Sequence, residues 1–365
     1  MIRRLRRLVF LYWKKVSLLS NARLFHILAL IYGRDSIYFT NASLRHDGFG
    51  AQLQRVMSVA AFAKYTKINF VYSPLVQIEI QHGDFIRDPG NRVGYLNRCN
   101  EWVRSLIYSA TTLPTRKLER FSGKEIEFIN RKLILYFFRH YGSRPVLYFE
   151  IDDMYFYLNS SPSLYREVIR PKSNLCIGEK VRAPRIAIHA RLATMVRGSE
   201  RYLDPEVIIL FLKEISFWSD SQIVKPDVFL FTDITLGKVD LSYVRSEVSH
   251  ETMTLWQEMG IADPSGSIAV DMSIQLEHFL SEVREVYPEI IIRDKLEVTE
   301  ALHEIEEMDL FIGSKSSFSF IYGLLARDSF VLMPEFWIRP LPHWVNYVGL
   351  KDSRRKIRAI LSQLE

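Results

Sequence analysis

Three arginines lie in one stretch near the middle of the chain, and their chemistry suits an anionic ligand. Arg191 follows an apolar segment that ends at His189, and Arg197 and Arg201 come shortly after it. Guanidinium groups stay charged and offer paired N–H donors that match phosphate oxygens. We therefore predict a diphosphate site in which Arg191 acts in catalysis and His189, Arg197 and Arg201 bind substrate. Solvated loop arginines and a core histidine are the alternative interpretation.

A second segment, residues 313–319, combines a glycine with several hydroxyl-bearing residues. Small residues let the backbone approach a ligand closely, and N–H and hydroxyl groups suit phosphate or ribose oxygens. The substrate contacts predicted here are Ser314, Lys315, Ser316, Ser317 and Phe318. One of the serines is also suited to cap a following helix, and both roles can hold. The GxxxxGK[ST] spacing of a Walker loop is absent.

A third segment, residues 46–52, places a histidine and an aspartate before two glycines. His46 and Asp47 are the predicted general bases that accept the proton of an acceptor hydroxyl. The glycines permit positive φ and a tight approach before a helix, although an Asp-Gly turn is the alternative reading. The third glycine of GxGxxG is missing, which argues against a nicotinamide site. The predicted substrate contacts are Gly48, Phe49, Gly50 and Gln52.

Acidic residues in two places are candidate metal ligands or substrate contacts. Asp233 follows a predicted strand, so we expect it to meet a ribose or a sugar. Glu150, Asp152 and Asp153 end another predicted strand, but they do not form a DxD arrangement. Paired acids at a strand end are commonly solvated, and we predict no metal site and no metal cofactor.

The elements that must position these residues are clearest after Pro184. Apolar runs predict strands at 186–189, 228–231, 290–293, 309–312 and 330–333. Helical periodicity predicts a helix that begins at Asp204-Pro205, one over 268–286, one capped by Thr299, and one over 317–326. Repeated alternation of buried strands and helices predicts a parallel sheet that is covered on both faces. Such sheets bind ligands at the carboxyl ends of their strands, where the predicted site residues fall.

The amino-terminal half begins in the same way. Strands are predicted at 36–40, 68–72 and 146–149, and helices at 51–65, 97–110 and 123–140. We therefore predict an α/β protein with two Rossmann-like domains and a cleft between them. The predicted divisions are a basic amphipathic segment at 1–30, an acceptor domain at 31–178, a donor domain at 179–335, and a helical tail at 336–365 that packs back on the first domain.

Composition narrows the class of partner. The chain has 365 residues and a net charge of +6. Six basic residues and no acid lie in the first fifteen, so the remainder is neutral on this count: Arg3, Arg4, Arg6, Arg7, Lys14 and Lys15. A nucleic-acid binder spreads basic residues over a folded face, so we predict no such partner. The two cysteines, Cys99 and Cys176, match no zinc pattern and indicate reduced residues of a cytoplasmic protein.

The basic amino-terminal residues flank the apolar run Leu8–Trp13. No uninterrupted apolar stretch reaches the length of a membrane span, and no cleavage site of a signal peptide is evident. Basic residues beside Trp and Leu favour a helix that lies on an anionic membrane surface, so we expect peripheral membrane association. A basic helix packed on its own domain is the alternative.

The three segments together resemble a known pattern. Residues 46–53 resemble the GGxGNQL-type loop of bacterial α-1,2-fucosyltransferases and protein O-fucosyltransferases, with Ala51 in place of Asn. Residues 188–191 resemble the HxRxGD motif of these enzymes, with Leu192-Ala193-Thr194 in place of Arg-Gly-Asp, and residues 309–319 resemble their D-x-x-I-x-S-x-S-S-F-S segment.

This resemblance implies a GT-B fold and an inverting transfer from GDP-fucose without a metal ion. It implies that Arg191 contacts the donor diphosphate, that His189 lies beside it, and that Ser316, Ser317 and Phe318 line the donor pocket. The acceptor would be a glycan or a lipid-linked glycan. Two kinds of alternative remain open: a transferase of another nucleotide sugar or of pyruvyl groups in surface polysaccharide synthesis, and a non-catalytic sugar or nucleotide binder at the membrane surface.

Overall fold

A computed structural model describes the structure of the following parts of the chain. These are residues 37–41, 48–78, 90–107, 118–121, 146–151, 182–191, 203–232, 238–240, 269–271, 273–326, 329–334 and 343–364, and residues 25, 168, 254, 257 and 341 singly. The chain divides into two compact units. Unit 1 comprises Met1–Glu79 and Val93–Leu175, and unit 2 comprises Ile80–Arg92 and Cys176–Glu365.

The described strands of unit 1 form a parallel sheet in the order β2-β1-β4-β3. They are β1 (Ile37–Asn41), β2 (Asn69–Phe70), β3 (Leu118–Phe121) and β4 (Val146–Ile151), and the helices are α2 (Phe49–Thr66) and α3 (Arg92–Leu106). The strands predicted at 36–40, 68–72 and 146–149 are confirmed, whereas β3 was not predicted. Helix α3 begins five residues before the predicted 97, and the helix predicted at 123–140 lies outside the described residues.

Aromatic side chains form the core of unit 1. The ring of Phe39 in β1 stacks on Phe62 of α2, with centroids 5.3 Å apart, and meets Phe25 edge-on at 4.8 Å. A buried polar contact adds to this packing. The Asn100 side chain of α3 accepts hydrogen bonds from the Tyr72 hydroxyl at 2.5 Å and the Leu75 N–H at 2.8 Å. Buried amides are costly unless paired, so these bonds fix α3 against the segment after β2.

Unit 2 is built on a larger parallel sheet, in the order β12-β11-β10-β5-β6-β9. Its strands are β5 (Arg185–Ala190), β6 (Asp227–Thr232), β9 (Ile291–Arg293), β10 (Leu310–Ile312), β11 (Phe330–Pro334) and β12 (Val345–Tyr347). Its helices are α7 (Pro205–Ser219), α9 (Ser273–Val286), α10 (Val298–Ile305), α11 (Ser317–Leu325) and α12 (Gly349–Leu361). The predicted α/β class and the predicted alternation of strands and helices after Pro184 are confirmed.

Two predicted helix starts in unit 2 are wrong. Residues 269–271 form β8, which pairs antiparallel with β7 (Lys238–Asp240), so α9 begins at Ser273 rather than at 268. Helix α10 is capped by Glu297 and not by Thr299, because the Glu300 carboxylate accepts a hydrogen bond from the Glu297 N–H at 3.0 Å. Strand pairing and a reciprocal acidic cap both override the local periodicity at these positions.

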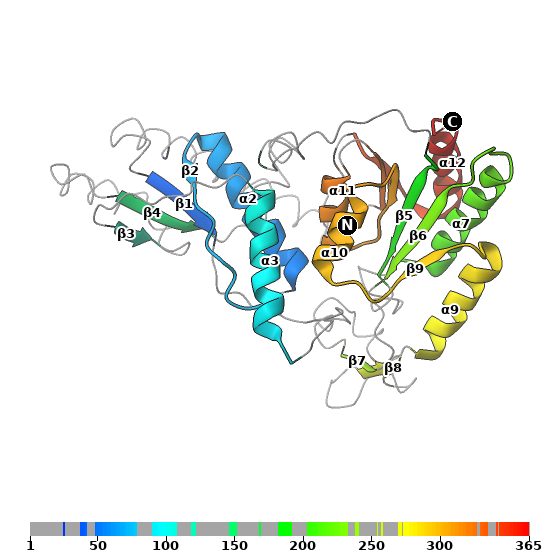
Figure 1. Cartoon of the computed structure of the whole chain (residues 1–365), viewed down its shortest axis with the longest axis horizontal. Helices are drawn as coiled ribbons and strands as arrows, with labels where there is room; N and C mark the ends of the chain where they lie inside the picture. The colour runs from blue at the N-terminus through cyan, green and yellow to red at the C-terminus, as the bar shows by residue number, and fades with distance from the viewer. Residues whose placement is uncertain are drawn as a thin grey trace. The chain divides into compact units, whose positions relative to one another are not determined.

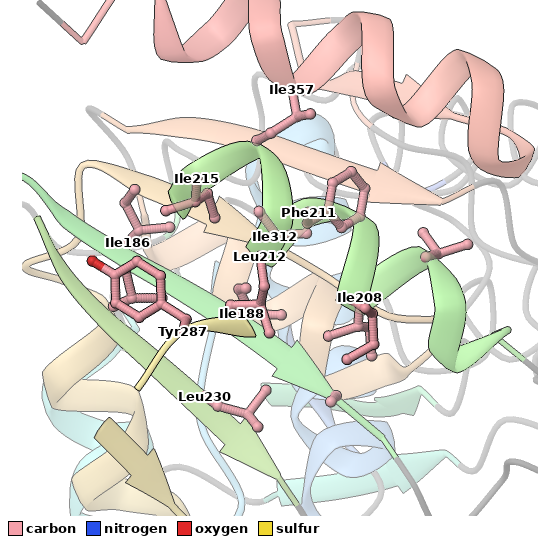
Figure 2. Packing of buried hydrophobic residues seen from close by; sticks show 14 of the residues in the cluster. Ile186, Ile188, Ile208, Phe211, Leu212, Ile215, Leu230, Tyr287, Ile312 and Ile357 are labelled. Atoms are coloured by element: carbon pink, nitrogen blue, oxygen red, sulfur yellow. The ribbon is translucent and has the colours of Figure 1, made fainter. Parts of the chain in front are cut away.

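Helices cover both faces of the unit 2 sheet. Helices α7, α9 and α12 lie on one side of it, and α10 and α11 on the other (Figure 1). Alternate strand residues such as Ile186, Ile188 and Leu230 point toward the first group and pack with Phe211 and Leu212 of α7 (Figure 2). Asp204 begins α7 by accepting the Glu206 N–H at 3.1 Å, ahead of Pro205 in the first turn.

The described part of the carboxyl-terminal tail packs on unit 2, whereas the sequence predicted packing on the first domain. Ile357 of α12 enters the same apolar cluster as Ile215 of α7 (Figure 2). Glu214 of α7, which is 6% exposed, binds Arg354 at 2.9 Å and Arg358 at 2.5 Å. A buried carboxylate needs a cationic partner, and α12 supplies two of them.

The predicted membrane-binding segment 1–30 lies outside the described residues apart from Phe25. Its association with a membrane therefore stays a prediction. Where the structure describes helices, each of them is too short or too polar to cross a bilayer.

Candidate functional site at the carboxyl ends of β5 and β10

The strand order of unit 2 defines where a ligand would bind. From β5 the chain passes through α7 to β6 on one side, whereas β10, reached through α10, lies on the other side of β5. The chain connections that leave β5 and β10 therefore run in opposite directions along the sheet. In open α/β sheets, ligands bind outside the carboxyl ends of the strands at such a switch point. Arg191 directly follows β5, and Gly313 directly follows β10.

Two predicted residues meet at this point. The guanidinium Nη1 of Arg191 donates a hydrogen bond to the Ser316 hydroxyl oxygen at 3.2 Å. The same oxygen accepts the Phe318 N–H at 3.1 Å and thereby caps the first turn of α11. Both lone pairs of this oxygen therefore accept hydrogen bonds within the protein. A guanidinium, a hydroxyl and a helix N-terminus thus converge, and all three favour an anion.

His189 is a buried residue near the end of β5, two positions before Arg191. It is 6% exposed, and its Nδ1 is 2.6 Å from the Ser319 hydroxyl and 3.3 Å from the Ser314 hydroxyl. The Ser319 oxygen also accepts the Ser314 N–H at 2.8 Å. The contacts of Nδ1 with these two serine hydroxyls connect β5 to the loop after β10 and to α11. The Tyr322 ring packs edge-on against the imidazole, with centroids 5.1 Å apart.

This enclosure changes the acidity of His189. Burial is the larger cause and the nearby positive charge of Arg191 the smaller one, and together they lower its pKa from 6.5 to about 3. The imidazole is therefore neutral near pH 7. A neutral imidazole has one N–H donor and one acceptor nitrogen, so His189 contributes hydrogen bonding but no charge.

The loop between β10 and α11 is held by its neighbours. The Gly313 N–H donates to the Leu332 carbonyl of β11 at 2.8 Å, and the Tyr347 hydroxyl of β12 donates to the Gly313 carbonyl at 2.8 Å. A side chain at this position would place its Cβ 2.0 Å from the Met333 sulfur. A close approach to the Met333 side chain therefore favours glycine here, whereas the sequence suggested a close approach of the backbone to a ligand.

The other predicted residues of this segment lie around the start of α11. Ser314 and Ser316 are each 1% exposed, whereas Lys315, Ser317 and Phe318 are half-buried. The Phe318 ring lies 6.0 Å from that of Tyr322, which also contacts His189. The structure therefore brings together His189, Arg191 and the predicted residues 314–318 within unit 2.

The predicted residues of the third segment belong to unit 1 and have structural contacts there. Gly48 caps α2 with a φ of −64°, so it does not use the positive φ that the sequence suggested. Phe49 is fully buried and meets the Trp102 ring at 6.2 Å, and Gly50 is buried in the first turn. The Gln52 amide donates to the Gln77 carbonyl at 2.7 Å.

Five predicted site residues lie outside the described residues: His46, Asp47, Arg197, Arg201 and Asp233. Their roles stay predictions. Within the described ranges, no group of three or more His, Cys, Asp and Glu side chains is arranged to hold a metal ion.

Sequence reasoning omitted two residues of the site. Ser319 lies on the buried face of α11, where a hydroxyl among apolar residues is a weak indication of a polar contact. Tyr347 follows no recognisable motif, and its strand has only three residues. The contact of Tyr347 with Gly313 joins positions 34 residues apart, so no local pattern indicates it.

No protein-family model matches the sequence, and no curated protein does. Several solved structures align with most of the chain. POFUT1 in complex with GDP-fucose aligns with 15% identity and a TM-score of 0.41, over 87% of this chain and 98% of that one. The NodZ α-1,6-fucosyltransferase soaked with GDP-fucose aligns with 13% identity and a TM-score of 0.34, over 79% and 92%.

The fucosyltransferase NodZ from Bradyrhizobium aligns with 13% identity and a TM-score of 0.33, over 79% of this chain and 92% of that one. At this degree of structural similarity, function has to be inferred from the residues of this chain.

Proposed function

We propose that this protein is a glycosyltransferase that uses a nucleoside diphosphate sugar, with GDP-fucose as the donor. One observation carries the proposal: Arg191, at the carboxyl end of β5, hydrogen-bonds to Ser316, the N-cap of α11, at the switch point of a doubly wound sheet. This arrangement presents a fixed guanidinium and a helix N-terminus to one ligand, as a diphosphate requires.

The reaction needs stabilisation of the leaving group. An acceptor hydroxyl attacks the anomeric carbon while the bond from that carbon to the β-phosphate oxygen breaks, so negative charge grows on the departing diphosphate. Arg191 and the Ser316 hydroxyl are placed to bind that charge, and they would stabilise the transition state more than the ground state. A single displacement of this kind inverts the configuration at the anomeric carbon.

The remaining roles follow the sequence-based predictions. The proton of the acceptor hydroxyl goes to His46 or Asp47, and Arg197 and Arg201 add positive charge beside the donor. Asp233 follows β6, the neighbour of β5, and contacts the ribose or the sugar. His189 contributes hydrogen bonding without charge because its imidazole is neutral. The acceptor is a glycan or a lipid-linked glycan, and the basic segment 1–30 keeps the enzyme at the cytoplasmic membrane surface.

A nucleotide screen tests this proposal. Thermal unfolding of the full-length protein is followed with GDP, UDP, GDP-fucose, GDP-mannose and UDP-sugars, and released nucleotide is then assayed with and without EDTA. We expect GDP and GDP-fucose to raise the melting temperature more than their UDP counterparts, and EDTA to leave nucleotide release unchanged. Failure of every nucleotide to stabilise the protein would refute the proposal. Stabilisation without any release in the presence of glycan acceptors would indicate a binding protein.

A further inference from the structure

Tyr347 makes a contact with the candidate site from outside all three motifs. It ends β12, is 2% exposed, and its hydroxyl donates to the Gly313 carbonyl at 2.8 Å. Gly313 is the first residue after β10, and Ser314 and Ser316 follow it in the same loop. The hydroxyl therefore acts on the backbone only one residue before the first serine of the site.

The position of Tyr347 is itself well determined. Its ring meets Phe211 of α7 edge-on, with centroids 5.1 Å apart, and lies in the apolar cluster beneath α7 and α12. Burial raises the pKa of its hydroxyl, so this group stays protonated and remains a donor. Tyr347 thus connects the packing of α7 with the backbone of the loop.

Both backbone groups of Gly313 are held by strands that follow β10 in the sequence. Leu332 of β11 accepts its N–H, and Tyr347 of β12 donates to its carbonyl. A buried carbonyl that loses a hydrogen-bond donor is costly unless another partner replaces it, and a replacement would require the loop to move. Such a movement would displace the Ser316 hydroxyl, which already lies 3.2 Å from Arg191.

We propose that Tyr347 is a positioning residue for the donor site: its hydroxyl fixes the 313–316 loop so that Ser314 meets His189 and Ser316 meets Arg191. This inference rests on the proposed function, because it concerns the same site. Displacements of about 1 Å in a binding group are sufficient to cost roughly a hundredfold in rate. Loss of the Tyr347 hydroxyl should therefore weaken donor binding in addition to lowering the stability of the fold.

The chain supplies a matched control. The Tyr287 hydroxyl donates to the Pro226 carbonyl at 3.2 Å, and Tyr287 is 5% exposed in the same apolar cluster. Pro226 precedes β6, so this bond lies at the opposite end of the sheet from the candidate site. Tyr347→Phe and Tyr287→Phe each remove one buried hydroxyl that donates to a carbonyl, and each keeps the ring.

The experiment compares the two variants with the wild-type protein by calorimetric titration with GDP, at a temperature at which all three are folded, and by steady-state kinetics with GDP-fucose. We expect both variants to unfold at a lower temperature than the wild type. We expect GDP affinity to fall roughly tenfold to a hundredfold in Tyr347→Phe and to stay unchanged in Tyr287→Phe.

Unchanged GDP affinity in Tyr347→Phe, or an equal loss in both variants, would overturn the positioning role while leaving the proposed function intact. Failure of the wild-type protein to bind GDP or any other nucleotide would overturn the proposed function and this inference with it.

Discussion

At the level of single residues, burial gives His189 and Arg191 different charges and therefore different roles. One residue separates His189, near the end of β5, from Arg191, which directly follows that strand, but only the guanidinium is a cation near pH 7. Burial and, to a smaller extent, the charge of Arg191 lower the pKa of His189 to about 3. Arg191 therefore carries the charge that a diphosphate needs, and His189 supplies a fixed hydrogen-bonding group.

We expect the neutral state of His189 to be visible in the pH dependence of stability. In the unfolded chain His189 binds a proton near pH 6.5, whereas in the folded protein its pKa is about 3. Between these values the unfolded state binds more protons, so the free energy of unfolding decreases as the pH falls, by up to about 1.4 kcal/mol per pH unit. Denaturant titrations above and below pH 6.5 should give a shallower dependence in His189→Gln. Parallel curves for the two proteins would contradict this.

We expect Arg191→Ala to lower turnover of GDP-fucose by about a hundredfold, the usual scale for the loss of one transition-state contact. Arg191→Lys should recover only part of that loss, because an ammonium keeps the charge but not the paired donors. Steady-state kinetics and calorimetry with GDP measure both effects. Arg185→Ala is the control, since Arg185 begins the same strand and pairs with Glu307. If a folded Arg191→Ala protein turned over GDP-fucose at the wild-type rate, the proposed role of Arg191 would be wrong.

At the level of elements, the start of α11 serves the fold and the site together. Ser316 caps the helix through Phe318 and also accepts a hydrogen bond from Arg191. Asp204 caps α7 in a comparable way through Glu206, but no described contact joins it to the site. The two caps therefore allow the structural role of Ser316 to be separated from its binding role.

We expect Ser316→Ala and Asp204→Ala each to lower the free energy of unfolding by about 1 kcal/mol, the usual contribution of an N-cap. Only Ser316→Ala should weaken GDP binding, because it also removes a hydroxyl donor beside Arg191. Chemical denaturation and calorimetric titration of the two variants provide the comparison. If both variants bound GDP as the wild type does, Ser316 would be a helix cap alone.

At the level of the whole chain, the carboxyl-terminal helix completes unit 2. Ile357, Ile360 and Leu361 of α12 are each at most 3% exposed and enter the cluster that α7 and α9 also line. Glu214 of α7 is buried and binds two arginines of α12. Unit 2 therefore reaches from the middle of the chain to its last helix, and β12 carries Tyr347 into the same core.

We expect deletion of the chain from Gly349 onward to abolish the cooperative folding of unit 2. Burial of each of the three apolar side chains contributes about 2 kcal/mol, which in sum is comparable to the whole stability of an ordinary domain. Soluble yield and thermal unfolding measure the effect. Arg355→Ala is the control, since the Arg355 side chain is 77% exposed on α12. A truncated protein that melts at the wild-type temperature would show that α12 is dispensable.

Local patterns in the sequence determine much of the fold. Strands that are buried on both faces are continuous apolar runs, and this is why β5, β6, β10 and β11 could be predicted. The apolar run of β9 was predicted as well, although this edge strand is only half-buried. The type of a residue also indicates what it can bind. Arg191 and Ser316 were predicted as site residues because guanidinium and hydroxyl groups can bind phosphate when they follow the end of a strand. Three-residue strands such as β8 and β12 escaped prediction because only their pairing partners define them.

The sequence by itself therefore determined the α/β class, the parallel sheet after Pro184 and the residue types available at its carboxyl ends. Only the tertiary structure decided that His189 is neutral, that Ser319 and Tyr347 belong to the site, and that the tail packs on unit 2. The physical reason is the distance along the sequence over which each property is determined. Periodicity and residue chemistry are local properties, whereas burial, pKa and the partner of a buried polar group depend on residues that are distant in the sequence, as Ser319 is from His189.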